Sequence, residues 1–175
     1  CAAFCTLSVM CSFPAEPADL QQPADVATPA GNLGVGIDVG GSGIKGAVVD
    51  LDTGEFASER VKIATPKPAT PQAVGEVITE VVRQLGWEGP VGVALPSVIK
   101  SQVATTAANI DDAWIGTDVH ELLADHLGQR PVCALNDADA AGLAEVAFGE
   151  ADAKSGAVVF LTFGTGIGTA LFLDG

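Results

Sequence analysis

The sequence predicts an α/β fold, in which one domain is followed by the opening hairpin of a second. Apolar, β-branched segments and one segment of helical periodicity follow each other in the order β-β-β-α-β between residues 33 and 95. A strand, a glycine-rich turn and a second strand occur twice, at 33–51 and again at 158–173. Because the two segments are alike, we expect a duplicated domain in which each half contributes one such hairpin.

The first hairpin has the composition of a phosphate-binding turn. Its opening strand ends at Asp38 and Val39, and three glycines and Ser42 follow. Glycines let backbone N–H groups approach an anion closely, a hydroxyl and a lysine add contacts, and a carboxylate beside the turn could hold a metal ion. We therefore expect the terminal phosphates of a phosphoryl donor to bind near Asp38, Gly40, Gly41, Ser42, Gly43 and Lys45.

Two other glycine motifs fit this turn less well. Gly41, Gly43 and Gly46 match the dinucleotide-binding pattern G-x-G-x-x-G, but that pattern requires a helix next and an acidic residue about 20 positions on. The chain instead continues with the β-branched run AVVDL. A Walker A loop would end in Gly-Lys-Ser/Thr, which is absent here. A hairpin that binds no ligand stays open as a simple alternative.

Composition narrows the class of protein. The 175 residues suffice for one core and part of another, and 22 acidic against 8 basic residues argue against nucleic acid as a partner. No apolar run is long enough to cross a membrane. The cysteines form no C-x-x-C pair, so zinc is not expected. Free thiols are the simplest state in a cytoplasmic protein for Cys1, Cys5, Cys11 and Cys133.

The chain divides into three parts. Residues 1–33 are rich in proline and alanine without periodicity, which predicts a disordered tail. Residues 34–150 form the first domain, and 151–175 begin the second. The chain ends in Asp174-Gly175, a hairpin-turn signal with no strand after it, so we expect a fragment truncated inside its second domain. Other expected elements are a strand at 56–64, a helix at 71–85 capped by Thr70, a strand at 91–95, an ambiguous segment at 99–106 that could form a hairpin, a loop at 107–115, a helix from its cap Asp118 to His126, a strand at 132–135 and a helix at 138–148.

Asp137 follows the expected strand at 132–135, at the edge where open α/β sheets bind ligands. A carboxylate at that edge could accept a hydroxyl proton during phosphoryl transfer. It could equally cap the helix that follows, and the residues alone leave both roles open.

Four segments carry a more specific signal, and they are, in order, GIDVGGSGIKGAVVD, TAANIDDAWIGTD, LNDADAAGLAE and LTFGTGIGTALF. Together they resemble the ROK family of sugar kinases, over residues 34–175. The resemblance implies a ribonuclease-H-like, actin-type ATPase fold of two domains around a cleft. It also implies phosphoryl transfer from polyphosphate or ATP to the 6-hydroxyl of glucose, with Mg²⁺, by a protein that is a homodimer when complete.

The same resemblance implies roles for individual residues. Asp137 would be the general base and would contact the sugar together with Asn109 and Asn136, while Asp38 would position Mg²⁺ through water. Ser97 stands beside the sugar pocket where family members usually have a glycine after proline. The first phosphate loop would contain Gly40, Gly41, Ser42, Gly43 and Lys45, and the second Gly164, Thr165 and Gly166.

Two alternatives differ in activity. A sugar-sensing regulator of the same family would bind a sugar without catalysis, but such proteins carry an N-terminal DNA-binding domain, which the proline-rich tail does not resemble. The chain by itself could also be an inactive fragment, because the downstream sugar and nucleotide contacts of the family would lie beyond Gly175.

Overall fold

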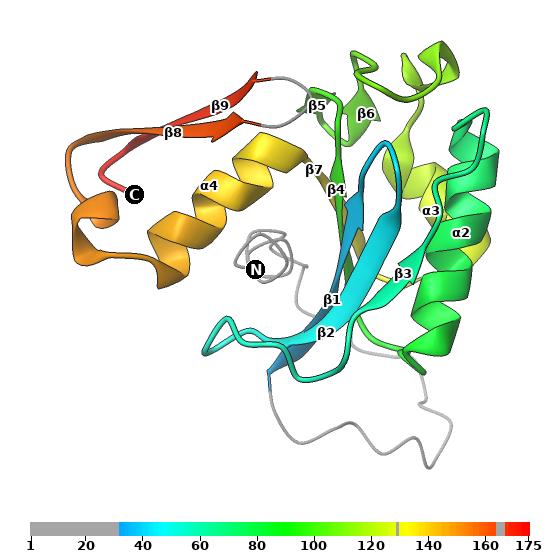
Figure 1. Cartoon of the computed structure of the whole chain (residues 1–175), viewed down its shortest axis with the longest axis horizontal. Helices are drawn as coiled ribbons and strands as arrows, with labels where there is room; N and C mark the ends of the chain where they lie inside the picture. Colours follow the sequence, from blue (N-terminus) through cyan, green and yellow to red (C-terminus); the bar gives the residue numbers. More distant parts are fainter. Residues whose placement is uncertain (1–31, 129, 164–166) are drawn as a thin grey trace, which may run out of the picture.

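The computed structural model describes residues 32–128, 130–163 and 167–175. A five-stranded sheet in the order β3-β2-β1-β4-β7 lies at its centre (Figure 1). The first three strands are antiparallel neighbours, whereas β1, β4 and β7 run parallel to each other. The strands are β1 (Leu33–Val39), β2 (Ile44–Asp50), β3 (Val61–Ile63), β4 (Val91–Leu95) and β7 (Val132–Asn136).

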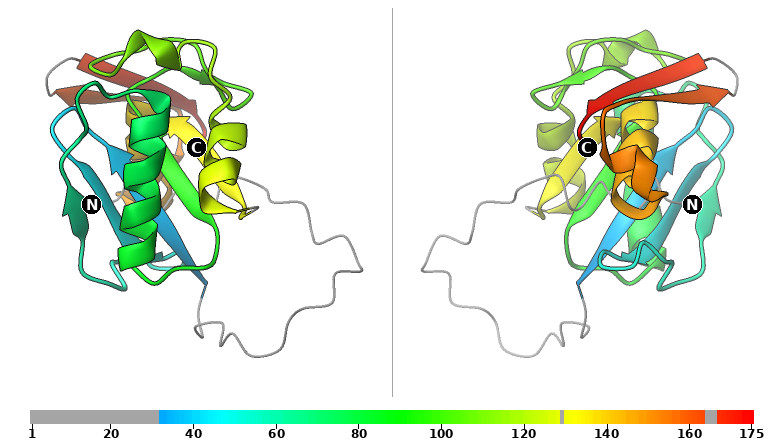
Figure 2. Two further views of the ribbon diagram at one scale, coloured as in Figure 1. Left: turned by 90° about the vertical axis from the view of Figure 1, so that its right-hand side faces the viewer. Right: turned by 90° about the vertical axis from the view of Figure 1, so that its left-hand side faces the viewer.

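Helices cover both faces of this sheet. The crossover helices α2 (Pro71–Gln84) and α3 (Val119–Leu127) pack together on one face, over the main apolar core. Helix α4 (Asp137–Phe148) lies on the opposite face, as the two side views show (Figure 2). The predicted mixed α/β fold is therefore confirmed.

The helix at 71–84 begins and packs as its sequence predicts. Pro71 is its first residue, and the Thr70 hydroxyl accepts a hydrogen bond from the Ala73 amide at 3.4 Å. Val74, Ile78 and Val81 lie at helical spacing and are completely buried against the sheet. The apolar stripe that the sequence predicts is thus the side of α2 that faces the core.

Two segments, 56–64 and 107–115, differ from the prediction, whereas the segment 99–106 forms the hairpin that its sequence allowed. The expected strand at 56–64 is much shorter, because the Ser58 hydroxyl takes the hydrogen bond of the Val48 amide and the chain rejoins the sheet only in β3. Only a single bridge, at Phe56, precedes it. The ambiguous segment forms the small hairpin β5–β6, and the expected loop contains a short 3₁₀ helix; the three elements are β5 (Ile99–Lys100), β6 (Val103–Ala104) and η1 (Asp112–Trp114).

The second glycine hairpin forms a separate two-stranded sheet. Its strands are β8 (Ala157–Phe163) and β9 (Ile167–Leu173), and the 3₁₀ helix η2 (Ala151–Lys154) leads into them from α4. One face of the hairpin packs against α4 (Figure 1). The other face exposes large apolar side chains, among them Phe163 and Leu171. The predicted repeat of strand, turn and strand is confirmed, while the division into domains stays a prediction.

The structure bears on two features predicted from composition, the state of the cysteines and membrane-spanning segments. Cys133 is disulfide-bonded, so the prediction of a free thiol is wrong for this residue. Within the described ranges, no helix combines the length and apolar character needed to cross a bilayer. The predicted tail lies almost entirely outside the described residues.

Candidate active site

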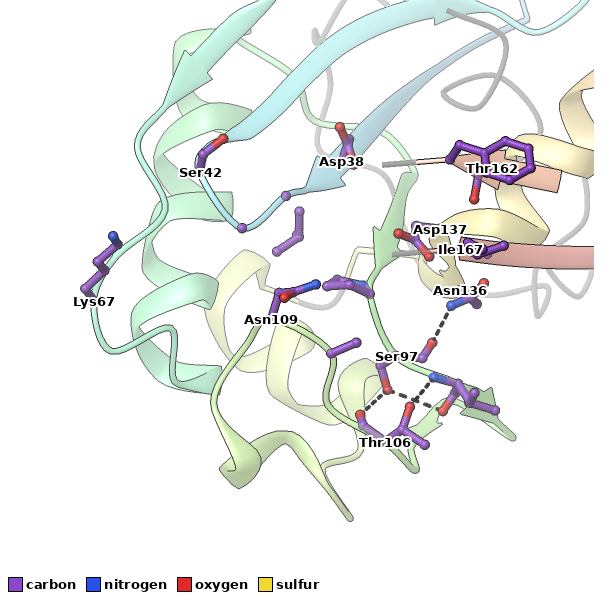
Figure 3. Close-up of a pocket in the computed structure, with 18 residues that line it drawn as sticks. Asp38, Ser42, Lys67, Ser97, Thr106, Asn109, Asn136, Asp137, Thr162 and Ile167 are labelled. Atoms are coloured by element: carbon purple, nitrogen blue, oxygen red, sulfur yellow. Dashed lines mark hydrogen bonds between the residues drawn. The ribbon is translucent and has the colours of Figure 1, made fainter. Parts of the chain in front are cut away.

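The parallel strands β1, β4 and β7 end at the same edge of the sheet, where ligands of open α/β folds bind. Their ends bring together the first glycine turn, the segment after β4 and the start of α4. The hairpin β8–β9 closes the space from a fourth side (Figure 3). The cavity has a volume of about 850 Å³, and its polar side chains are Asp38, Ser42, Lys67, Ser97, Thr106, Asn109, Asn136, Asp137 and Thr162.

The first glycine turn presents its tip to the cavity. The Gly40 amide donates to the Gly43 carbonyl at 3.1 Å and so closes the turn. Gly41 and Ser42 are exposed and line the cavity. Gly43 is buried and does not line it. Lys62 packs so closely on Gly43 that a Cβ there would lie 2.8 Å from the Lys62 Cε. The contacts available to an anion are therefore concentrated at two residues.

Asp38 and Lys45 form an ion pair beside this turn. They are cross-strand partners in β1 and β2, and the Lys45 ammonium lies 3.1 Å from a carboxylate oxygen of Asp38. Asp38 lines the cavity, whereas Lys45 does not. Each side chain is about one-third exposed, at 34% and 38% respectively. Lys45 thus acts on the cavity through its effect on Asp38.

Asp137 stands at the first position of α4, directly after the helix cap. The cap is Asn136, whose side-chain oxygen accepts hydrogen bonds from the Ala138 and Asp139 amides at 2.9 and 3.2 Å. The alternative that Asp137 serves as the cap is therefore wrong. The carboxylate of Asp137 lines the cavity on the side opposite the first glycine turn (Figure 3).

The environment of Asp137 favours its protonated form more than water does. Partial burial raises the pKa of the Asp137 carboxyl, and the negative charge of Asp38 raises it further, while a hydrogen bond from the Ala138 amide partly offsets the rise. Burial and the charge of Asp137 raise the pKa of Asp139 in the same way. A carboxylate with a raised pKa is a stronger proton acceptor, as general bases require.

The two predicted sugar-binding asparagines both line the cavity. Asn109 has a left-handed backbone with φ of 62°, and it packs against the first glycine turn, 3.7 Å from the position of a Cβ on Gly41. Asn136 already uses its oxygen to cap α4, and its Nδ2 donates to the Ser97 carbonyl at 3.1 Å. Asn109 therefore has the freer amide of the two.

Several lining residues were not among the predicted site residues. Lys67 lies in the proline-containing loop before α2, where no local pattern marks it. Thr162 occupies the place in β8 that Asp38 occupies in β1, one residue before the end of the strand. An alignment of the two hairpins would have found Thr162. Gly164, Thr165 and Gly166, the predicted second phosphate loop, lie outside the described residues.

A protein family and several known proteins match most of this chain. The family model described as the ROK family covers residues 34–175. The polyphosphate glucokinase of Mycobacterium tuberculosis (strain H37Rv) is 55% identical over 142 residues, which are 81% of this chain and 54% of the relative. That of Mycobacterium leprae (strain TN) is 51% identical over 154 residues, which are 87% of this chain and 48% of the relative. The chain spans about half the length of these curated relatives.

Solved structures agree with this assignment. The inorganic polyphosphate/ATP-glucomannokinase from Arthrobacter sp. strain KM has a TM-score of 0.77 and 46% identity, over 81% of this chain and 58% of that chain. A ROK family glucokinase from Streptomyces griseus, in complex with glucose and AMPPNP, has a TM-score of 0.70 and 30% identity, over 82% and 45%. The fold is thus the actin-like α/β fold of ROK sugar kinases, and the chain belongs to the ROK family.

Proposed function

We propose that this chain carries the first half of a glucokinase active site, which transfers a phosphoryl group from polyphosphate or ATP to the 6-hydroxyl of glucose. The observation that carries the proposal is the placement of Asp137 across one cavity from the tip of the first glycine turn. A proton acceptor and an anion-binding turn on opposite sides of one space are what phosphoryl transfer to an alcohol requires. Relatives named polyphosphate glucokinases, 55% and 51% identical, support the choice of substrates.

On the acceptor side, Asp137 takes the proton of the sugar hydroxyl. Its raised pKa keeps it a stronger base than an ordinary aspartate. Asn109 orients the sugar by hydrogen bonds to its hydroxyls, and the remaining N–H of Asn136 adds a second donor. Holding the hydroxyl in line with the donor phosphate contributes a large part of catalysis in this class of reaction.

On the donor side, the turn of Gly40, Gly41 and Ser42 receives the terminal phosphates, with the amides of Gly41 and Ser42 as the donors left at its tip. Gly164, Thr165 and Gly166 would form the second phosphate loop. The cavity fits Mg²⁺ in the way this ion is usually bound, through one or two carboxylates, water and substrate phosphates. Asp38 is the residue that would hold it, since its carboxylate borders the cavity next to the turn. Among the described residues, no group of three acidic, histidine or cysteine side chains could hold a metal without such help. When bound, Mg²⁺ would neutralise charge on the phosphates.

The proposal includes the cellular location and the oligomeric state of the complete protein. A cytoplasmic location fits the use of ATP as an alternative donor, and the family resemblance favours a homodimer for the complete protein. Sedimentation of the complete gene product tests the second point, because a monomer would exclude it.

The decisive experiment measures glucose phosphorylation by the complete product of this gene and by the 175-residue chain, with ATP or polyphosphate as donor in the presence of Mg²⁺. Activity with either donor supports the proposal, and a folded complete product that binds glucose without turnover supports a sugar sensor instead. Asp137→Ala should lower kcat by about 10² to 10⁴-fold, since it removes a general base. Asp139→Ala, two residues along the same helix, is the matched control and should stay within twofold. Activity of Asp137→Ala within tenfold of wild type would exclude the general-base role.

A further inference from the structure

Two buried hydroxyl groups that the proposed reaction does not use are hydrogen-bonded to segments that line the cavity. Thr65 is 7% exposed and Ser97 is 1% exposed, and these are the buried polar side chains of the residues that the structure describes. Burying a hydroxyl costs free energy unless it is hydrogen-bonded, so the partners of these two groups are informative. Each of them is a backbone carbonyl on a segment that lines the cavity.

Thr65 fixes the first glycine turn. It lies between β3 and α2, and its hydroxyl donates to the Gly40 carbonyl at 2.5 Å. The other side of Gly40 is fixed by its amide, which donates to the Gly43 carbonyl at 3.1 Å. A glycine has no Cβ to restrict its backbone, so these two bonds set the orientation of its peptide groups. The Gly40 carbonyl and the Gly41 amide belong to one planar peptide group, so the bond from Thr65 determines where the Gly41 amide points.

Ser97 fixes the segment that carries Asn109. It follows β4, and its hydroxyl donates to the Thr106 carbonyl at 2.6 Å (Figure 3). The same stretch is held by the Ala108 amide, which donates to the Pro96 carbonyl at 3.0 Å. The Ser97 carbonyl in turn accepts from Asn136 Nδ2 at 3.1 Å. One buried serine therefore connects the end of β4 to both asparagines of the cavity.

We propose that Thr65 and Ser97 are positioning residues with separate duties: Thr65 orients the donor-binding turn, and Ser97 orients the sugar-binding segment. The inference rests on the proposed function for the names of the two ligands. The two hydroxyls share no hydrogen-bond partner and hold different segments, 40–43 and 106–109, so the larger effect of each variant should fall on its own segment, while the contact of Asn109 with Gly41 transmits a smaller effect to the other. Small displacements of groups that position a substrate are enough to weaken transfer.

The kinetic test compares Thr65→Val and Ser97→Ala in the complete gene product. Thr65→Val should raise KM for the phosphoryl donor about three- to tenfold and leave KM for glucose within twofold, because one hydrogen bond is lost on the donor side. Ser97→Ala should do the reverse. Thr65→Ser keeps the hydroxyl and should restore the donor KM. Equal changes in both KM values for either variant would overturn the division of duties.

Matched controls remove hydroxyls elsewhere in the fold. Thr79→Val deletes a hydroxyl that donates to the Gly75 carbonyl inside α2, and Ser58→Ala deletes the hydroxyl that bonds to the Val48 amide. Neither residue lines the cavity, so both variants should leave both KM values within twofold. A KM change in these controls as large as in Thr65→Val or Ser97→Ala would assign the effect to general loss of stability.

A second readout separates this inference from the proposed function. Amide hydrogen exchange of the 175-residue chain without any ligand reports the order of each segment directly. Thr65→Val should speed exchange about three- to tenfold in residues 40–43 and less in 106–109, and Ser97→Ala should do the opposite. If the protein does not phosphorylate glucose but exchange follows this pattern, the proposed function fails and the positioning stands. Unchanged exchange in both segments overturns the positioning.

Discussion

The two glycine hairpins have strands of the same length, seven residues each, but they lie in different surroundings. β1 and β2 are interior strands of the five-stranded sheet, and Ile37 and Ile44 are completely buried. β8 and β9 pair only with each other, and Val159, Phe163 and Leu171 are 61%, 77% and 66% exposed. A strand–turn–strand pattern therefore specifies a hairpin, whereas the elements packed around it decide how much of it is buried.

The hairpins also differ in charge where they meet the cavity. Asp38 of the first pairs with Lys45, while Thr162 of the second pairs with Gly168 across the strands. A side chain on Gly168 would lie 2.4 Å from the Thr162 hydroxyl and 2.7 Å from the Cβ of Ala138. The first hairpin thus provides charged groups, and the second provides a backbone that approaches the start of α4 closely.

The largest expected effect tests the difference in burial. Ile37→Ala should lower the free energy of unfolding by about 2–5 kcal/mol, because it removes a completely buried side chain and leaves a cavity. Val159→Ala, in the exposed face of the second hairpin, should change it by less than about 0.5 kcal/mol. Urea unfolding of the 175-residue chain measures both. Similar losses for the two variants would contradict the comparison.

The helix that follows the first hairpin could be predicted because its sequence signals are local. Thr70 before Pro71, and apolar residues at helical spacing, define α2 without reference to the rest of the chain. The shortened third strand could not be predicted, because it depends on a bond between Ser58 and the distant Val48 amide. Local propensity carries no information about such long-range competition.

The candidate site divides along the same line. Asp137 and the glycine turn follow strands, so the topology of an α/β sheet brings them to one edge. The position of Lys67 at the cavity and the hydrogen bond from Thr65 to Gly40 could not be predicted, because both residues lie in the irregular segment between β3 and α2. The choice of Asn109 depended on family resemblance alone, since its left-handed backbone is not marked by any neighbouring residue.

A second, smaller effect should appear where the second hairpin packs on α4. A side chain at Gly142 would lie 2.6 Å from the ring of Phe172 and 3.1 Å from the Cβ of Ala170. Gly142→Val should therefore displace β9 and lower the free energy of unfolding by about 1–3 kcal/mol, as overpacked sites do. Hydrogen exchange should rise in β8–β9 and stay unchanged in β1–β2.

The exposed surface of the same helix provides the control for Gly142→Val. Glu145→Val adds a β-branched residue to α4 on its exposed side. This variant should leave exchange in both hairpins unchanged. If it also released β8–β9, helix propensity rather than the contact with Phe172 would explain the result.

A still smaller effect should follow from neutralising Asp137, which faces the charged end of the first hairpin. Because folding raises its pKa, the folded protein binds the proton more tightly than the unfolded chain, so stability falls as pH rises through the raised pKa. Asp137→Asn avoids that loss and should be more stable than wild type at pH 7 by about 0.5 kcal/mol, allowing for solvent screening. The difference should vanish below the ordinary value of 3.8.

Thermal unfolding between pH 3 and pH 8 checks the sign of the Asp137 effect. If the stability of Asp137→Asn relative to wild type instead rose on acidification, folding would stabilise the Asp137 carboxylate and not destabilise it. The apparent pKa read from the acid limb of the pH–rate profile for glucose phosphorylation should likewise lie above the pKa of an ordinary carboxyl.

The smallest expected change in stability concerns the exposed face of the second hairpin. Val159 and Leu171 are direct cross-strand partners there, so Val159→Glu with Leu171→Lys replaces an apolar pair by an ion pair. The free energy of unfolding of the 175-residue chain should stay within about 0.5 kcal/mol, while light scattering should show less association because an apolar patch is removed. Phe160→Glu is the matched control: successive strand residues face opposite sides, so this change lies on the face toward α4 and should detach the hairpin. If the double variant lost more than about 1 kcal/mol of the free energy of unfolding, the outer face of the second hairpin would be packed against other residues. The two hairpins would then not differ in burial.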